Sequence, residues 1–463
     1  MLSSGKGTPT HARRPSTLDF CVVASSSTDD TGWILRGALL LTAEQNERLT
    51  QIGPGTPMGT LLRRYWHPVA TEFEMNNEPT KRVRILGESL TLYLNKSGNY
   101  GLIGERCPHR LVNLAAGIVE PNGLRCMYHG WMFNAEGECI EQPAEPQGSA
   151  FKDKVRITAY PVEVLGGLIW AYLGPNPRPL LPRWDLFVKE GVFRQIGCTV
   201  LPANWVQCQE NSADSWHAHF THGWYATYLI ERFESKGMPV TDEMRRIAAG
   251  FKNNPDMKHS YERHRFGLLK RRLRVHDSED VHGWRVGHPI VFPNYVRIGK
   301  KGWSTFQMRV PLDDTHTWHL DYEVIDPGPD VEVPNQDIIP AYDVPLMDLP
   351  NFILGQDYVA WSEQGEIADR TQEMLGSSDE GVIMFRKLLA EQIDVVLEGG
   401  DPINTVRDPA KNECITIEAE DYGTFEDYVD NAFAYYDTSP HGFVDEVEDL
   451  FQKAKSAAIQ KKG

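Results

Sequence analysis

Four residues of metal-ligand type, in two short motifs, constrain the fold of this chain more than any other feature. Cys107 and His109 stand in Cys-Pro-His, and Cys126 and His129 stand in Cys-Met-Tyr-His. One Cys and one His from each of two loops form a set of four ligands only if the loops face each other. Two β-hairpin tips that clamp one centre from both sides meet this condition, so the motifs predict a β-rich domain around them.

Three interpretations of these residues are open. Zinc accepts such a set, usually with tetrahedral geometry. A Rieske [2Fe–2S] cluster also accepts it, with two thiolates on one iron and two imidazoles on the other. Without a metal they would be ordinary core residues, which the coincidence of both spacings disfavours. Tyr128, Gly130 and Trp131 favour the cluster, because small and aromatic residues let backbone N–H groups approach the sulfides and exclude water.

The segment around the motifs has the pattern of a β domain. Apolar residues alternate from Val83 to Leu94, and a turn is predicted at 96–99. A hairpin is predicted over 131–140 and a buried strand over 168–173. The proline-rich stretch 175–182 interrupts helix and sheet, so we place the boundary of a domain 66–178 there.

The rest of the chain, 179–463, mixes strands and helices in a predicted second domain. Two strands are expected between 306 and 324, followed by a proline-rich loop over 327–350. Helices are expected over 352–364 and from about 378 to the Gly-Gly pair at 399–400.

Two segments precede the β domain. Residues 1–40 are rich in Ser, Thr and Gly and lack periodicity, which predicts a disordered tail or an extension from a start codon placed too far upstream. Residues 41–65 are expected to be helical, because Thr42 and Gln45 form a capping box.

Composition limits the compartment and the partners. The chain has 463 residues and a formal net charge of −17, which argues against nucleic acid as the main partner. No apolar run approaches the roughly 18 residues that span a bilayer. The seven cysteines are irregularly spaced and form no disulfide framework, so a cytoplasmic protein that does not bind membranes is expected.

A second cluster of possible ligands lies between Glu210 and His222. If its first part is helical, Asp214 and His217 share a face. His217 and His222 are five residues apart, so a helix must loosen or end for both to reach one ion. Two His and a later carboxylate would leave open positions on a metal, as in non-haem Fe(II) oxygenases. Either histidine alone would more often be an ordinary hydrogen-bonded residue.

With the upstream motifs, this stretch resembles the Glu-Asn-x-x-Asp-x-x-His-x-x-x-x-His segment of Rieske non-haem iron oxygenase α-subunits. The resemblance spans about Leu41 to Leu397 and is strongest to the phthalate dioxygenase-like branch. It implies an α+β protein, with an all-β Rieske domain followed by a helix-grip (START-like) α+β catalytic domain. Many members have Gly where this chain has Leu111-Val112, a departure expected to alter packing and not ligation.

The resemblance also implies roles for individual residues. The Rieske cluster would be held by Cys107, His109, Cys126 and His129. The mononuclear Fe(II) would be held by His217, His222 and Asp357, with Asp357 in a Gln-Asp pair on a later helix. Asp214 would accept hydrogen bonds from His217 and from His129 of a neighbouring subunit, which implies a homotrimer or a dimer of trimers. His219 is expected to be structural or to support the ligands.

The expected activity uses O₂ and externally supplied electrons to hydroxylate a small aromatic compound. No G-x-G-x-x-G fingerprint for a dinucleotide is present. NAD(P)H would therefore act indirectly, through a separate flavin/iron–sulfur reductase or a ferredoxin. Ring dihydroxylation of a phthalate- or benzoate-like acid is the first hypothesis, and O-demethylation of a dehydrodivanillate-like aryl ether is the alternative. A non-catalytic Rieske electron-transfer protein is the second alternative.

A basic run in this acidic chain admits three interpretations. It comprises Lys258, Arg263, Arg265, Lys270, Arg271, Arg272 and Arg274. Such a run is usually a solvated face. It could instead dock an acidic redox partner, or contribute an arginine to a substrate carboxylate.

Overall fold

The computed structural model describes residues 41–300, 302–343, 353–420 and 445–460. The expectation for residues 1–40 lies outside these ranges. Among the described helices, none is both long and apolar enough to cross a bilayer.

The N-terminal half is a β module of three small sheets. Their strand orders are β1-β11-β10, β2-β3-β4-β9 and β5-β6-β7-β8. The strands are β1 (Trp66–Thr71), β2 (Thr80–Ile85), β3 (Glu88–Leu94), β4 (Tyr100–Gly104), β5 (Ile118–Glu120), β6 (Gly123–Arg125), β7 (Met132–Phe133), β8 (Cys139–Glu141), β9 (Ala159–Tyr160), β10 (Val162–Leu165) and β11 (Leu168–Tyr172). The predicted hairpin is β7–β8, and the predicted buried strand is β11, which is buried at every position.

The C-terminal half is built on one eight-stranded sheet with the order β13-β14-β15-β16-β17-β18-β12-β19. Its strands are β12 (Phe193–Leu201), β13 (Asp256–His264), β14 (Gly267–Arg274), β15 (His288–Val291), β16 (Tyr295–Lys300), β17 (Trp303–Pro311), β18 (Thr317–Ile325) and β19 (Ala341–Asp343). The two strands predicted between 306 and 324 are β17 and β18, paired antiparallel. Because β19 pairs in parallel with β12, the prediction of a proline-rich loop over 327–350 was wrong at 341–343. Residues 344–350 of that prediction lie outside the described ranges.

Helices and short turns complete the two halves. The helices are α1 (Ala43–Thr50), α2 (Pro57–Leu62), α3 (Glu72–Asn77), α4 (Asp185–Val188), α5 (Trp205–Ala213), α6 (His217–His219), α7 (Ala226–Ser235), α8 (Asp242–Asn253), α9 (His282–Val286), α10 (Ile353–Glu363), α11 (Glu380–Leu397) and α13 (Asp445–Gln460). The segment η3 (Phe220–Tyr225) is a π-helix, and short 3₁₀ turns are η1 (Leu114–Ala116), η2 (Lys152–Lys154), η5 (Ser377–Asp379) and η6 (Pro409–Lys411).

Local sequence explains several of these elements. Thr42 and Gln45 form the predicted reciprocal capping box at the start of α1. The helix predicted over 352–364 is α10, and the next predicted helix is α11, which begins after Asp379 and ends at Leu397. Along α11, apolar residues at helical spacing, among them Phe385 and Leu389, are fully buried.

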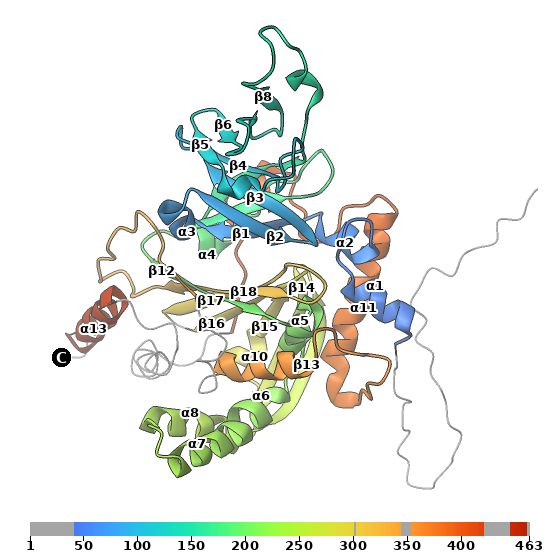
Figure 1. The fold of residues 1–463 in the computed structure, drawn as a ribbon. Coiled ribbons are helices and arrows are strands. Elements are labelled where there is room, and N and C mark those ends of the chain that lie inside the picture. Colours follow the sequence, from blue (N-terminus) through green and yellow to red (C-terminus); the bar gives the residue numbers. More distant parts are fainter. Residues whose placement is uncertain (1–40, 301, 344–352, 421–444, 461–463) are drawn as a thin grey trace, which may run out of the picture.

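The eight-stranded sheet lies between the β module and the helices α5, α6, α7, α8 and α10 (Figure 1). Strands β17 and β18 are buried almost throughout, because both faces of the sheet are covered. One continuous apolar cluster includes Leu90 and Trp170 of the β module together with Phe306 and Tyr322 of the sheet. The two halves therefore share a core.

Candidate functional site

The two cysteine–histidine motifs lie on neighbouring turns at the tip of the β module. The first follows β4, and the second connects β6 to β7. Each turn is closed by backbone hydrogen bonds, from the Leu111 N–H to the Cys107 carbonyl (2.8 Å) and from the Gly130 N–H to the Cys126 carbonyl (3.1 Å). The structure therefore brings the two loops together, as the motifs predicted.

The four side chains fit a Rieske cluster. Both thiols are buried, whereas His109 is exposed and His129 is half-buried. The two imidazole centroids are 4.4 Å apart. Burial, together with the adjacent Cys126 thiol, raises the pKa of Cys107 to about 11. A cation beside a buried thiol favours the thiolate, and bound iron would supply that cation.

The surroundings of the loops support this fit. Trp131 stacks on His109 with centroids 4.7 Å apart and planes 6° apart. Leu111, at the position where many Rieske oxygenases have Gly, adopts a positive φ of 60° and is 66% exposed. A left-handed conformation costs a leucine about 1–2 kcal/mol. The turn nevertheless keeps its hydrogen bond from the Leu111 N–H to the Cys107 carbonyl.

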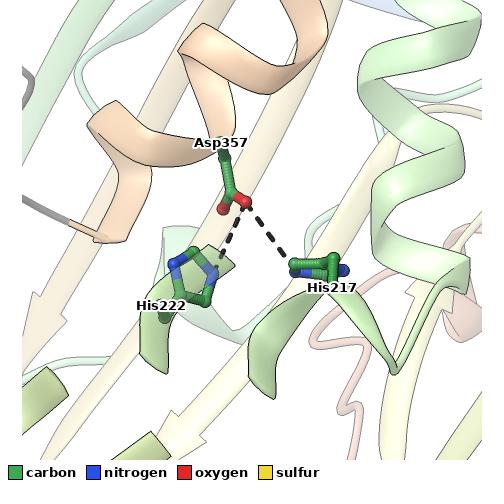
Figure 2. A group of neighbouring side chains, drawn as sticks. All are labelled: His217, His222 and Asp357. Carbon is green, nitrogen blue, oxygen red and sulfur yellow. Dashed lines mark ion pairs between the residues drawn. The ribbon is translucent and has the colours of Figure 1, made fainter. Parts of the chain in front are cut away.

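A second group of ligand-type side chains lies on the helical side of the sheet. His217, His222 and Asp357 offer ligand atoms that all lie within 4.8 Å of one another. The Asp357 Oδ1 atom is 3.7 Å from the Nε2 atom of His217 and 3.5 Å from that of His222 (Figure 2). The same two histidines and one aspartate were singled out from the sequence. The fold brings together His217 of α6, His222 of η3 and Asp357 of α10.

The π-helix η3 explains how histidines five residues apart share one centre. Its wider turn closes i→i+5 hydrogen bonds, so residues five apart come onto the same side. The imidazole centroids of His217 and His222 are 5.4 Å apart as a result. The helix loosens at this point, as the spacing required.

Neighbouring side chains orient the three ligand-type groups. The His222 Nδ1 atom is 2.8 Å from Oε1 of Gln356, and an Nδ1–H donated to this oxygen leaves Nε2 free to face Asp357. Asn211 on α5 donates to the Asp357 carboxylate at 3.2 Å. The group can therefore hold a metal through two imidazoles and one carboxylate, with room for further ligands.

The geometry of Asp214 differs from the helical hypothesis. Helix α5 ends at Ala213, and Asp214 is its C-cap in extended conformation (φ −92°, ψ 133°), so Asp214 and His217 do not share one helical face. They meet across the next turn, with Asp214 Oδ2 3.4 Å from His217 Nδ1. Asp214 Oδ1 accepts the Trp216 N–H at 2.8 Å, because a carboxylate readily caps a turn two residues on.

His219 has partners of its own. Its Nδ1 atom lies 2.9 Å from the Phe251 carbonyl, and Trp224 donates to Nε2 at 3.2 Å. Both ring nitrogens are thus used within the protein, and His219 fixes η3 to α8.

Glu210 is buried under the site between two arginines. Its carboxylate accepts from Arg370 Nη2 (2.9 Å) and Arg386 Nε (2.6 Å). Burial alone would raise the pKa of Glu210, but the two guanidinium groups hold it at about 2. Since Arg386 also binds Glu373, the network ties α5 to α11 and to the segment before it.

A pocket opens beside the three ligand-type side chains. One part of its wall is apolar and includes Ala218, Phe251, Val296, Ile298, Trp303 and Leu354. The sheet adds polar side chains: Lys270, Arg272, Arg274, His288, Gln307 and Arg309. Glu420 also lines it. Arg309 and Glu420 were not singled out from the sequence, because no local motif marks them.

Family profiles match two regions of the chain. The Rieske [2Fe-2S] domain matches residues 65–161, and the "LigXa C-terminal domain like" family matches residues 346–419. The first match contains all four residues at the tip of the β module, and the second contains Asp357 and the whole of α11.

Characterised relatives extend along most of the chain. The 5,5'-dehydrodivanillate O-demethylase oxygenase subunit of Sphingobium sp. strain SYK-6 is 42% identical over 387 residues, which are 82% of this chain and 86% of the relative. The phthalate 4,5-dioxygenase oxygenase subunit of Pseudomonas putida is 31% identical over 415 residues, covering 79% and 89% of the two chains.

Among solved structures, NdmA of Pseudomonas putida CBB5, as a QL mutant with theobromine, has the same fold. Its TM-score is 0.54 at 20% identity, with 74% of this chain and 94% of that one covered.

The oxygenase relatives match well beyond the Rieske domain, which excludes a lone electron-transfer protein or a zinc module. The chain therefore belongs to the Rieske non-haem iron oxygenases of aromatic compounds, as an oxygenase (α) subunit that uses a [2Fe–2S] cluster, mononuclear iron and O₂.

Proposed function

We propose that this oxygenase O-demethylates a methoxylated aromatic acid. The observation that carries the proposal is the 42% identity to a dehydrodivanillate O-demethylase subunit over 82% of the chain. Hydroxylation of the methoxy carbon gives a hemiacetal, which breaks into a phenol and formaldehyde. One oxygen atom of O₂ enters the methyl group, and the other leaves as water with two electrons and two protons.

We assign the mononuclear iron to His217, His222 and Asp357, and the cluster to Cys107, His109, Cys126 and His129. When bound, the iron activates O₂ with electrons that a separate reductase supplies through the cluster. Gln356 and Asn211 hold a ligand imidazole and the carboxylate in place, at 2.8 and 3.2 Å. The apolar wall formed by Phe251 and its neighbours would hold an aromatic ring and exclude water.

We assign Asp214 to the path between the two centres. Its carboxylate contacts the imidazole of His217, and 29% of its side chain is exposed, so a second subunit can reach it. A carboxylate between two imidazoles fixes the tautomer of both. His129 of a neighbouring subunit is its expected partner, in a homotrimer or a dimer of trimers.

Ring cis-dihydroxylation is the second candidate. A phthalate 4,5-dioxygenase subunit is 31% identical over 79% of the chain, and the same iron ligands serve both reactions. In that case both oxygen atoms of O₂ would enter the ring of a phthalate- or benzoate-like acid.

Product identification distinguishes the two reactions. The iron-loaded protein, a surrogate reductase and NADH are incubated with 5,5'-dehydrodivanillate and with panels of methoxybenzoates and phthalates. We expect formaldehyde and a phenol in equal amounts from a methoxylated acid, and neither from Asp357→Asn protein. If the product is a cis-diol that retains its methoxy groups, or if only phthalates give products, the assigned reaction would be ring dihydroxylation and not O-demethylation.

A further inference from the structure

A stack of aromatic rings connects the first cluster histidine to the protein surface. The Trp131 ring lies nearly parallel to the His109 imidazole, with centroids 4.7 Å apart and planes 6° apart. Phe151 contacts Trp131 in an edge-on arrangement, with centroids 5.8 Å apart. Trp131 is buried, whereas Phe151 is 45% exposed. The three rings therefore make a continuous contact from an assigned iron ligand to solvent.

The segment around Phe151 is fixed against the cluster loops. It follows β8, at the opposite end of the molecule from α6 (Figure 1). The Lys152 ammonium donates to the Ile140 carbonyl at 2.9 Å, which holds the chain directly after Phe151. A Cβ atom at Gly130 would lie 3.0 Å from the Pro143 ring, so the start of the segment packs on the second cluster loop. Pro143 and Phe151 thus cover neighbouring residues of that loop.

The same segment is poor in charge. Glu145 is the only charged residue of 142–151, although 24% of the chain is charged. Every residue of the segment is exposed or half-buried, and Pro143, Ala150 and Phe151 are exposed. The core of a protein–protein interface is depleted in charged residues and enriched in aromatic ones. We call Pro143, Ala150 and Phe151 the Phe151 surface.

The two cluster histidines can serve two different transfers. The path assigned above leaves the cluster through His129 and reaches Asp214 of a neighbouring subunit. Electrons must also enter the cluster from a separate donor, and electron transfer slows steeply with distance. Entry through His109 and its aromatic stack leaves His129 open to the neighbouring subunit. Encounters between electron-transfer partners bury less than about 1,200 Å², so a compact surface is sufficient.

We propose that the Phe151 surface docks the [2Fe–2S] domain of the electron donor, and that electrons reach the cluster through Phe151, Trp131 and His109. The inference rests on the proposed function for a separate donor and for the exit at His129. One electron moves in each encounter, so the iron–sulfur centre of the donor is oxidised and the cluster is reduced. The aromatic rings mediate the transfer and keep their own oxidation state.

The test measures reduction of the cluster and not turnover of a substrate. The oxidised, cluster-loaded protein is mixed without oxygen with a reduced plant-type [2Fe–2S] ferredoxin, whose potential lies below that of a Rieske cluster. Rapid-freeze-quench EPR follows the reduced Rieske cluster at a series of ferredoxin concentrations. Wild type is compared with Phe151→Ala, Phe151→Tyr and Trp131→Leu. Ile118→Ala is the matched control, because Ile118 is a 52% exposed apolar residue of β5 in the same module.

We expect Phe151→Ala to lower the second-order rate constant for reduction by ferredoxin roughly tenfold or more, since a few aromatic residues dominate binding at interfaces. Phe151→Tyr should keep most of this rate, and Ile118→Ala should behave like wild type. Trp131→Leu should lower the limiting rate at saturating ferredoxin, because it removes the ring between Phe151 and His109. In Phe151→Ala, the cluster potential and the rate of reduction by dithionite, which needs no docking surface, should not change.

A second pair of variants adds charge and leaves the aromatic stack intact. Ala150→Glu places a carboxylate on the Phe151 surface, and Ile118→Glu places the same charge at another exposed position of the β module. We expect slower reduction by ferredoxin in Ala150→Glu alone. The cluster spectrum and the melting temperature establish that each variant is folded, and Ala150→Glu carries the test if Phe151→Ala is not.

Reduction of Phe151→Ala and Ala150→Glu by ferredoxin at the wild-type rate would overturn the docking surface, as would an equal slowing with dithionite. An unchanged limiting rate in Trp131→Leu would overturn the path through the stack. A smaller oligomer of Phe151→Ala in analytical ultracentrifugation would assign the Phe151 surface to contacts between subunits and overturn docking of the donor.

The outcome is separable from that of the proposed function, because cluster reduction is measured without substrate. Slow reduction of Phe151→Ala would uphold the Phe151 surface even if no methoxylated acid releases formaldehyde. Formaldehyde release together with normal reduction of Phe151→Ala would uphold O-demethylation and refute the surface.

Discussion

Two carboxylates four residues apart, Glu210 and Asp214, have opposite surroundings. Glu210 is buried between Arg370 and Arg386, which hold it in its charged form. Asp214 caps the end of α5, touches His217 and remains partly exposed. The first is placed to stabilise the fold, and the second is exposed enough for the role between subunits that we propose for it.

Asp214→Asn should separate metal content from turnover. The amide keeps the size of the side chain and its bond to the Trp216 N–H, but it cannot act as a charged acceptor between two imidazoles. We expect about three Fe and two sulfides per chain, as in wild type. NADH-coupled turnover should fall by roughly 100-fold or more. Near-normal turnover would rule out the assigned role of Asp214, and the exposed change Asp369→Asn serves as the control.

Glu210→Gln should destabilise the protein and alter its response to acid. Loss of one partner from a buried charge network costs about 3–5 kcal/mol. The folded-state pKa of about 2 lies below the unfolded value of about 4.3, so the carboxylate stabilises the fold above pH 4.3. This contribution disappears as pH falls from about 4.3 to 2, because the unfolded chain binds the proton more readily.

Urea unfolding at a series of pH values measures this effect. The stability difference between wild type and Glu210→Gln should be largest at neutral pH and shrink below about pH 4. Taking the difference in unfolding free energy between the two proteins cancels the effects of acid on groups that both proteins share. A difference that does not change with pH would mean that Glu210 is not charged in the folded protein. Glu373→Gln is the milder comparison, because Glu373 is 25% exposed and binds only Arg386 of the two arginines.

At the scale of elements, the site depends on how helices end and meet. The π-helix η3 brings His217 and His222 together, and α10 supplies Asp357 across from them. Helix α11 approaches the C-terminal end of α5 very closely at Gly381. A Cβ atom at Gly381 would lie 2.1 Å from the Ala213 carbonyl oxygen and 2.3 Å from the Tyr261 ring.

Gly381→Ala should therefore push α11 away from α5. Overpacking of this kind costs about 1–3 kcal/mol, which lowers the melting temperature. Because Ala213 directly precedes Asp214, we also expect slower turnover at unchanged iron content. The matched control is Gly250→Ala in α8, where a Cβ meets nothing within 4 Å, so stability should stay the same or rise by up to about 1 kcal/mol. A Gly381→Ala protein as stable as wild type would contradict the close packing.

At the scale of the whole molecule, the two candidate metal centres lie on opposite sides of the central sheet. Strands β5, β6 and β8 lie at one end of the molecule (Figure 1). Helices α6 and α10 lie on the other side of the eight-stranded sheet. A direct contact between Asp214 and His129 of the same chain is incompatible with this arrangement. The electron path that we propose through Asp214 therefore requires a second copy of the chain.

Mixed oligomers test this requirement. Asp214→Asn lacks the path, and Cys126→Ser lacks a cluster ligand, so each protein alone should be inactive. When the two variants are co-expressed with different affinity tags and purified on both tags, the mixed oligomers should regain turnover. The intact cluster of an Asp214→Asn subunit can then pass electrons to the intact iron site of a neighbouring Cys126→Ser subunit. Each mixed trimer restores one of its three junctions, so turnover should return to about a third of the wild-type rate. Mixed oligomers without activity would contradict transfer between subunits.

Local sequence patterns determined much of the fold and part of the site. The capping box of α1, the strand pairs around short turns and the apolar stripe of α11 follow from interactions between residues close in the chain. The loops that carry Cys107 and Cys126 were predictable for the same reason, because each pairs a Cys with a His within one turn. Family resemblance then identified Asp357, whose spacing from His222 has no periodic meaning.

Only the tertiary structure decided how distant segments meet. It ended α5 at Ala213, paired β19 with β12, and placed Arg309 and Glu420 in the same pocket wall. It also divided the basic run, directing Lys270, Arg272 and Arg274 inward and Arg271 outward. The physical reason is that a strand's alternation is readable from sequence, whereas the face that becomes a pocket depends on which helices pack over it.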